Sequence, residues 1–124
     1  MRTRSRTLTE QELEIMKVVW GLERATVRDV YETLRARRKI AYTTVMTMMN
    51  ILETKKYLKK RAQERAYVYQ TTRPRSEVVK ALVREFVDRV FNGSAEPLLV
   101  QLIRDRRLSK KELEELARAV EEAE

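Results

Sequence analysis

Apolar residues recur at helical spacing in three successive segments of the first 56 residues, and this repetition constrains the fold most strongly. In "LTEQEL", Thr9 precedes the first apolar stripe and Glu12 stands three residues later, which is the pattern of a capping box. Thr26 precedes the second stripe as a helix cap. The third lies in "AYTTVMTMMNILETKK", residues 41–56, which contains neither Gly nor Pro. The spacing therefore predicts three helices, and we expect Gly21 to end the first.

The third segment has two chemically different sides. Its apolar residues recur at i, i+3, i+4 and i+7 and should face a core: Val45, Met48, Met49 and Leu52. At about 100° per residue, uncharged polar residues fall nearly opposite: Thr43, Thr47, Asn50 and Thr54. Because 37% of the chain is charged, an uncharged threonine side is unusual for a solvated surface. We interpret it as a surface that reads a ligand; an ordinary solvated face is the alternative.

Two strand-like segments follow the third helix. "YLKKRA" and "RAYVYQTT" are rich in Tyr and Val, and the second alternates. Their connection near Gln63 and Glu64 lacks an Asn-Gly or Asp-Gly pair, so the hairpin rests on the strands themselves. The lysines and arginines of this pair either protect the strand edges or contact a polyanion. Three helices and a two-stranded ribbon predict a winged helix-turn-helix, a mainly α fold.

The excess positive charge lies entirely in this first part. Residues 1–72 contain 16 Lys and Arg against 8 Asp and Glu, whereas residues 73–124 contain 11 of each. The positive residues include the N-terminal "MRTRSRT" and the "RARRK" cluster, residues 35–39, whose position also suits a helix C-terminus. This asymmetry predicts a polyanion-binding domain, residues 1–72, joined to a domain of another kind, residues 73–124. A uniformly basic protein is the alternative.

The residue types that are missing exclude several classes of function. The chain has no Cys and no His, which excludes disulfides, zinc sites of the usual kind and Ser-His or Cys-His catalytic pairs. Two glycines cannot form a P-loop or a dinucleotide fingerprint. We therefore expect no enzyme activity, no metal and no cofactor. No apolar stretch is long enough to span a membrane, and the N-terminus lacks a signal-peptide core, so we expect a cytoplasmic protein.

The second part reads as three helices that are too short and too apolar to fold alone. Pro74 begins a helix that extends to residue 91, and "NGSAEP" interrupts it. Residues 97–106 are apolar nearly all round and should be buried. "LSKKEL" repeats the capping box with Ser109 and Glu112. We expect a homodimer interface, with packing onto the winged helix as the alternative. The predicted interface residues are Val79, Leu82, Phe86, Val90, Leu98, Leu99, Leu102, Leu113, Leu116 and Val120.

Double-stranded DNA fits these elements physically. The major groove admits an α-helix, short polar side chains reach base edges there, and the thymine methyl accepts apolar contact from a threonine methyl or Met46. The N-terminal amides of the second helix, beside Thr26, form a phosphate site, and Lys39 ends the cationic cluster. We expect DNA contacts from these residues and from Thr43, Thr47 and Asn50. A non-specific architectural or RNA-binding protein is the alternative, and an adaptor that binds protein is a third possibility.

Four motifs carry a resemblance to a known family. "LTEQELEIMKVVW", "TVRDVYETL", "AYTTVMTMMNIL" and "RAYVYQ" closely resemble the BlaI/MecI family of penicillinase and methicillin-resistance repressors, which includes the CopY copper repressors. The resemblance implies a dimeric winged-helix repressor that binds a TACA/TGTA-like dyad operator. It implies that the recognition helix presents Thr43, Thr44, Met46 and Thr47. It places Arg65 and Tyr67 on the wing and residues 74–123 in the dimerisation domain.

The same resemblance implies how repression ends. In better-known members, a membrane-bound sensor protease responds to β-lactams, the repressor is cut in the first short helix of the dimerisation part, and the dimer is lost. The family's cleavage pair is often Asn-Phe, and the matching residues here are Gln101 and Leu102. The copper branch carries a C-terminal cysteine motif that this chain lacks. The turn before the wing usually contains Gly, and because Lys56 stands there we expect a differently shaped turn.

Overall fold

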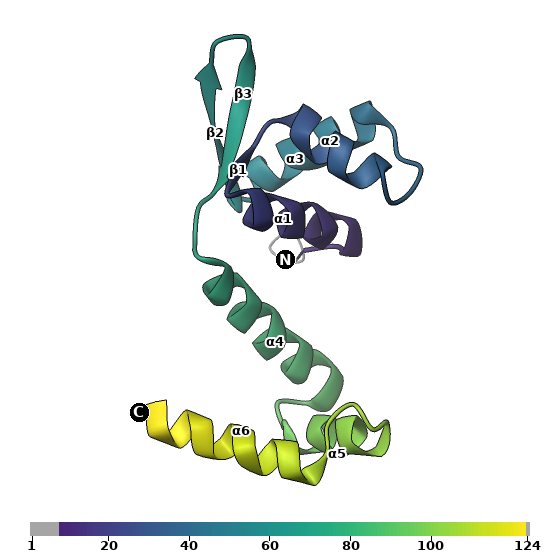
Figure 1. Cartoon of the computed structure of the whole chain (residues 1–124), viewed down its shortest axis with the longest axis vertical. Helices are drawn as coiled ribbons and strands as arrows, with labels where there is room; N and C mark the ends of the chain where they lie inside the picture. Colours follow the sequence, from purple (N-terminus) through teal and green to yellow (C-terminus); the bar gives the residue numbers. More distant parts are fainter. Residues whose placement is uncertain (1–7, 124) are drawn as a thin grey trace. The chain divides into compact units, whose positions relative to one another are not determined.

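A computed structural model describes residues 8–123 of the chain (Figure 1). It divides into two compact units, residues 1–79 and 80–124. The first unit contains α1 (Glu10–Leu22), β1 (Arg24–Ala25), α2 (Val27–Arg35), α3 (Tyr42–Thr54), β2 (Leu58–Gln63) and β3 (Ala66–Thr71). Helix α4 (Arg75–Phe91) begins in the first unit and continues into the second, which also contains α5 (Glu96–Arg104) and α6 (Lys110–Ala123). The expected mainly α, winged-helix fold is confirmed. Among the described residues, no helix is long and apolar enough to cross a membrane.

Capping boxes set the starts of α1 and α2; the sequence predicts the box at α1, and at α2 it predicts only the Thr26 cap. The Thr9 hydroxyl accepts the Glu12 N–H at 3.1 Å, and the Thr9 N–H donates to the Glu12 carboxylate at 2.9 Å. Thr26 and Asp29 exchange the same two bonds, both at 3.0 Å. Each box satisfies two N–H groups that have no partner inside the helix.

The end of α1 differs from the prediction. Gly21 does not end the helix, because α1 continues to Leu22 and Glu23 takes the cap position with φ 73°. The Glu23 N–H donates to the Val19 carbonyl at 2.7 Å, and this bond satisfies a carbonyl of the last turn. A glutamate therefore adopts the backbone conformation that we expected of the glycine, and Gly21 occupies an ordinary helical position.

The core of the first unit lies where the apolar stripes of α1, α2 and α3 meet. Its fully buried residues, with at most 1% exposure, include Ile15, Met16, Val19, Val30, Leu34, Val45, Met49 and Leu52. The predicted inner side of α3 is confirmed at Val45, Met49 and Leu52, and Met48 is half-buried. The core thus holds α3 through one side, and the opposite side remains exposed.

The wing is an antiparallel sheet with the strand order β1-β3-β2. The predicted hairpin is confirmed, and its register pairs Lys60 with Tyr69 and Gln63 with Ala66. Strand β1 was not predicted, because two residues are too few to show an alternating pattern. It joins the segment after α1 to β3 through the pairs Arg24 with Gln70 and Ala25 with Tyr69.

The turn between α3 and the wing keeps a left-handed residue without glycine. Lys56 has φ 70°, and the Tyr57 N–H donates to the Leu52 carbonyl at 2.9 Å. The expectation that a lysine here would change the shape of the turn is therefore wrong. The surrounding hydrogen bonds hold Lys56 in a conformation that costs a residue with a Cβ atom about 1 kcal/mol.

Two ion pairs join α1 to more distant parts of the first unit. Glu12, 3% exposed, contacts the Lys55 ammonium through both carboxylate oxygens at 2.8 and 3.1 Å. Glu14 accepts two hydrogen bonds from Arg38 at 3.2 and 2.8 Å, and this second pair is open to solvent. The Arg38 hydrogen bond holds the pKa of Glu14 below its usual value, although partial burial opposes the shift.

The second unit has its predicted helices but leaves them uncovered. Helix α4 ends at Phe91, where Asn92 and Gly93 take φ values of 56° and 87°, and the Ser109 hydroxyl accepts the Glu112 N–H at 3.0 Å. The expected burial of residues 97–106 is wrong for the single chain, since no residue of α5 is buried. Three helices on their own have too few neighbours to cover a segment that is apolar on nearly every side.

The first turn of α4 belongs to the same compact unit as the winged helix. The first unit extends to residue 79, and Val78 is only 2% exposed. The sequence suggested residues 1–72 and 73–124 on the basis of charge and Pro74. The difference in charge reflects residues on the exposed surface. It therefore gave no sign that the apolar start of α4 groups with the first unit.

Candidate nucleic-acid interface

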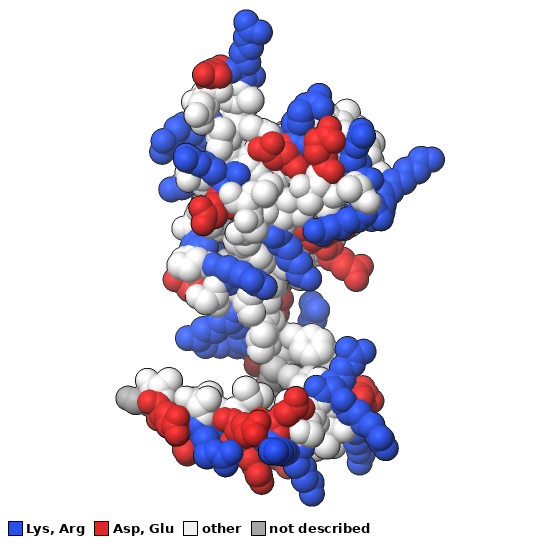
Figure 2. Space-filling view, viewed as in Figure 1, with Lys and Arg blue, Asp and Glu red and all other residues white. Residues whose placement is uncertain are grey.

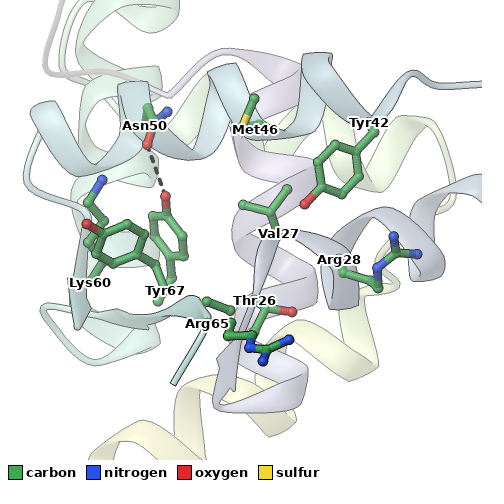
Figure 3. A pocket seen from close by; sticks show the side chains of 11 residues that line it. Thr26, Val27, Arg28, Tyr42, Met46, Asn50, Lys60, Arg65 and Tyr67 are labelled. Carbon is green, nitrogen blue, oxygen red and sulfur yellow. Dashed lines mark hydrogen bonds between the residues drawn. The ribbon is translucent and has the colours of Figure 1, made fainter. Parts of the chain in front are cut away.

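A groove lies between the N-terminus of α2, the outer side of α3 and the wing. Its cavity volume is about 510 Å³. We call it the wing groove, and Figure 3 shows the side chains that line it. They are Thr26, Val27 and Arg28 from α2 and its cap, Tyr42, Met46 and Asn50 from α3, and Lys60, Arg65, Ala66, Tyr67 and Tyr69 from the wing.

The outer side of α3 is exposed, as the helical spacing predicts. Exposed residues on and beside it are Thr43, Thr44, Met46, Thr47 and Asn50. Met46 is 38% exposed, and its side chain turns toward the wing groove together with that of Asn50 (Figure 3). An uncharged side of a helix is therefore presented outward next to a groove rimmed by cations.

Side chains tie α3 to the wing at the end of this groove. The Tyr69 hydroxyl donates to the Asn50 side-chain oxygen at 3.0 Å, which is the dashed line in Figure 3. The Lys60 ammonium lies 3.4 Å from the Glu53 carboxylate and 4.5 Å from the centre of the Tyr67 ring. Since Lys60 and Tyr69 are cross-strand partners, both contacts connect adjacent points of the wing to neighbouring turns of α3.

A second aromatic cluster lies at the start of α3. The rings of Tyr31 and Tyr42 pack edge to face, with centroids 5.4 Å apart. The Arg28 guanidinium lies 5.8 Å from the Tyr42 centroid, and Arg35 lies at the same distance from Tyr31. These contacts hold cationic groups of α2 beside the first turn of the outer side of α3.

The structure brings five of the nine expected DNA-contact residues into one groove: Thr26, Met46, Asn50, Arg65 and Tyr67. Thr43, Thr44 and Thr47 lie on exposed positions of α3 outside its lining, and Lys39 lies in the exposed connection before α3. Arg65 occupies the turn of the hairpin, and Tyr67, 52% exposed, is on β3. The basic N-terminal segment, residues 1–7, lies outside the described residues.

The N-terminus of α2 differs in detail from a free phosphate site. The Asp29 carboxylate already accepts the Thr26 N–H at 3.0 Å. An incoming phosphate therefore meets a carboxylate at this helix end, and Arg28 is the neighbouring cation that lines the groove.

Six groove residues were not among the predicted contacts: Val27, Arg28, Tyr42, Lys60, Ala66 and Tyr69. Tyr69 had a usable signal, because Tyr67 and Tyr69 are two residues apart and share one face of β3. Arg28 and Tyr42 had none, since they become neighbours only when α2 packs against α3.

Charge is distributed differently in the two units. Figure 2 shows lysine and arginine side chains on the wing and around α2, whereas acidic side chains gather along α6. Because positive charge surrounds the wing groove, the local field favours an anionic ligand.

Comparisons with known proteins relate the chain to a family. A sequence model of the penicillinase repressor family matches residues 8–122. The transcriptional regulator BlaI of Mycobacterium tuberculosis is 34% identical over 119 residues, which cover 94% of this chain and 85% of the relative. The penicillinase repressor of Bacillus licheniformis is 26% identical over 115 residues, covering 93% and 90%.

A solved structure extends the match to the fold. The solution structure of the DNA binding domain of the repressor BlaI superposes with a TM-score of 0.54 and 26% identity, covering 60% of this chain and 90% of that domain. The resemblance seen in the sequence motifs is thereby confirmed, and the chain belongs to the penicillinase repressor family, whose named members here are transcriptional repressors and regulators.

Proposed function

We propose that the chain is a sequence-specific transcriptional repressor that binds a dyad, TACA/TGTA-like operator as a homodimer. The observation that carries this proposal is the exposed, uncharged side of α3 beside the cation-rimmed wing groove. Family membership supports the general role of repressor, and the geometry supports DNA as the ligand. Occupation of a promoter would exclude RNA polymerase. Repression by this route requires no enzyme activity, metal or cofactor.

The chemistry of α3 suits direct reading of bases. Thr43 and Thr47 offer a hydroxyl and a methyl group each, and Met46 offers an apolar surface to a thymine methyl. Arg65 at the tip of the wing suits a phosphate or the minor groove. Base contacts from α3 would provide specificity, and cationic contacts would provide salt-dependent affinity.

Uncovered apolar side chains of the last three helices support a homodimer. Phe86, Val90, Leu116 and Val120 are 43, 50, 54 and 60% exposed, and Val79 is 37% exposed. The other predicted interface residues are half-buried: Leu82, Leu98, Leu99, Leu102 and Leu113. Complete burial of a large apolar side chain contributes about 1.5–3 kcal/mol, so a partner that covers several of them would stabilise these helices strongly. A second copy presents the same apolar residues and therefore matches them.

Loss of the dimer is our proposed route to derepression, through proteolysis by a membrane-bound sensor protease or through another signal. The bond between Gln101 and Leu102 lies inside α5, and Leu102 is half-buried. A protease would require this turn to unwind, because cleavage needs exposed, locally unfolded backbone. A signal that loosens α5 would thus act on the interface as well.

Base reading by α3 is tested with Thr47→Ala. The variant should bind a TACA/TGTA dyad duplex about tenfold more weakly, as expected for a lost base contact, and a random duplex about equally well. Thr33→Ala, which removes a threonine from α2, is the matched control and should leave both affinities unchanged. Equal losses on both duplexes would refute the reading role of Thr47. If the wild-type chain does not prefer the dyad, the alternative of a non-specific architectural DNA- or RNA-binding protein is favoured.

Phosphate contact by the wing is tested by salt dependence. Arg65→Ala should weaken binding to both duplexes and reduce the slope of log affinity against log salt by about one unit. Lys111→Ala removes an equal charge from α6 and should leave the slope unchanged. An unaltered slope for Arg65→Ala would remove this residue from the phosphate contacts.

The dimer is tested by sedimentation at low micromolar concentration. The expected mass is about twice the 14.8 kDa of one chain. Leu116→Glu places a charge on the most apolar exposed side of α6 and should shift the equilibrium toward monomer. A wild-type monomer under these conditions would refute the interface.

A further inference from the structure

The amide of Asn50 is held at one end by the wing. Its side-chain oxygen accepts the Tyr69 hydroxyl at 3.0 Å, although Asn50 itself is exposed. Figure 3 shows this oxygen directed to the tyrosine and the amide nitrogen directed away from it. The amide therefore presents its NH₂ group, which carries two donors, away from the tyrosine.

The fold fixes the tyrosine that imposes this orientation. Tyr69 is 2% exposed and stands in the centre of the sheet, paired with Ala25 on one side and Lys60 on the other. Burial raises the pKa of the Tyr69 hydroxyl, although the nearby Lys60 charge opposes the shift. The phenol keeps its proton and uses it in the hydrogen bond to the Asn50 oxygen, so the carbonyl end of the amide faces the tyrosine.

Orientation of this amide decides which base edges Asn50 complements. An exposed asparagine can turn its amide over and offer either its oxygen or its nitrogen. With the nitrogen presented, it complements acceptors of the major groove: guanine O6 and N7, adenine N7 and thymine O4. With the oxygen presented, it would instead accept from the amino groups of cytosine or adenine.

We propose that Tyr69 is a positioning residue for DNA recognition, which holds Asn50 so that its NH₂ group meets a base acceptor in each half-site. This inference rests on the proposed function and deepens it, since it makes Asn50 the hydrogen-bond donor in one contact with a base. Tyr69 itself does not touch DNA in this arrangement. Its effect on binding passes through the amide of Asn50.

A double-mutant cycle tests the proposal in the full-length chain. The probe is the duplex that the wild-type chain selects from a randomised pool, together with duplexes in which each base pair of a half-site is replaced in turn. Tyr69→Phe should weaken binding to the selected duplex about threefold to tenfold, the range for one hydrogen bond, and should relax discrimination at one base-pair position. Asn50→Ala should relax the same position. In the Asn50→Ala background, Tyr69→Phe should have no further effect.

A comparison variant separates positioning from general damage to the wing. Tyr67→Phe removes a hydroxyl from the same face of β3 and should preserve discrimination at the position that depends on Asn50. Tyr69→Phe should also leave binding to random duplex nearly unchanged. If it weakens binding equally with and without Asn50, its role is structural and the proposal is overturned. Unchanged discrimination at every position would overturn it as well.

Failure of this inference differs from failure of the proposed function. If the wild-type chain selects no sequence from the pool, sequence-specific repression fails, and the inference fails with it. If it selects a sequence that Tyr69→Phe reads equally well, only the positioning role fails.

Discussion

The ion pair between Glu12 and Lys55 should stabilise the first unit substantially, and Glu12→Gln isolates it. Glutamine preserves the capping box, because its side-chain oxygen still accepts the Thr9 N–H. What it removes is the charge that faces the Lys55 ammonium at 2.8 and 3.1 Å. The two side chains are only 4% and 14% exposed, so water screens this pair poorly.

The magnitude follows from burial. Removal of one partner from a fully buried pair costs about 3–5 kcal/mol, because a charge stays behind in a poorly solvated site. Lys55 retains some access to water, and glutamine oxygen still accepts a hydrogen bond, so we expect about 2 kcal/mol. For a unit of this size, each kcal/mol lowers the thermal midpoint by roughly 4–8 °C. Circular dichroism melts of the full chain should therefore show a midpoint roughly 8–16 °C lower.

Glu14→Gln is the matched control on the same helix. Glu14 and Arg38 form an ion pair of similar length, but their side chains are 29% and 39% exposed. Solvent screens such a pair, so its loss should lower the midpoint far less. Equal shifts for the two variants, or a shift below about 4 °C for Glu12→Gln, would refute burial as the source of the stabilisation.

Three further predictions concern stability. Gly21→Ala should raise the free energy of unfolding by about 1 kcal/mol, because an added Cβ meets nothing within 4 Å in the helix. Gly93→Ala should lower the free energy of unfolding, because Gly93 has φ 87°. Urea titration distinguishes the two outcomes. Lys56→Gly, at φ 70°, should raise it by about 0.5–1 kcal/mol, and a decrease would mean that the lysine side chain outweighs the backbone cost. Because the pKa of Glu14 is lowered from 4.5, its contribution should be complete above that pH and disappear as pH falls through the lower folded value. Urea titrations of wild type and Glu14→Gln should therefore differ near neutrality and converge in acid; a difference that persists would contradict the assignment.

Local chemistry explains why so much of the fold was predictable. The capping boxes join residues three positions apart, so they form as soon as the helix begins and depend on nothing distant. The inner and outer sides of α3 follow from its helical period alone, as do the buried Val45 and the exposed Thr47. The family motifs, which lie between residues 8 and 70, are likewise read in the order of the sequence.

The misplaced helix end shows a limit of residue preferences. Glycine is favoured in a left-handed cap, yet Glu23 takes the cap and Gly21 stays helical. The short strand β1 begins immediately afterwards at Arg24 and pairs with β3. Where α1 must stop is therefore determined by a strand partner more than forty residues away in the sequence, and no local preference contains that information.

Local residue patterns were sufficient to predict the helices, their inner and outer sides, the charged and neutral parts and the family. The construction of the groove depends instead on packing between distant segments. The bond between Asn50 and Tyr69 joins residues 19 positions apart, and the pair of Glu12 and Lys55 joins residues 43 positions apart. Such contacts depend on the register of the wing and on the packing of α1 against α3, because a side chain selects its partner only after the backbone has brought the two together. Composition predicted a polyanion-binding domain; the register of β3 placed the Tyr69 hydroxyl beside the Asn50 oxygen.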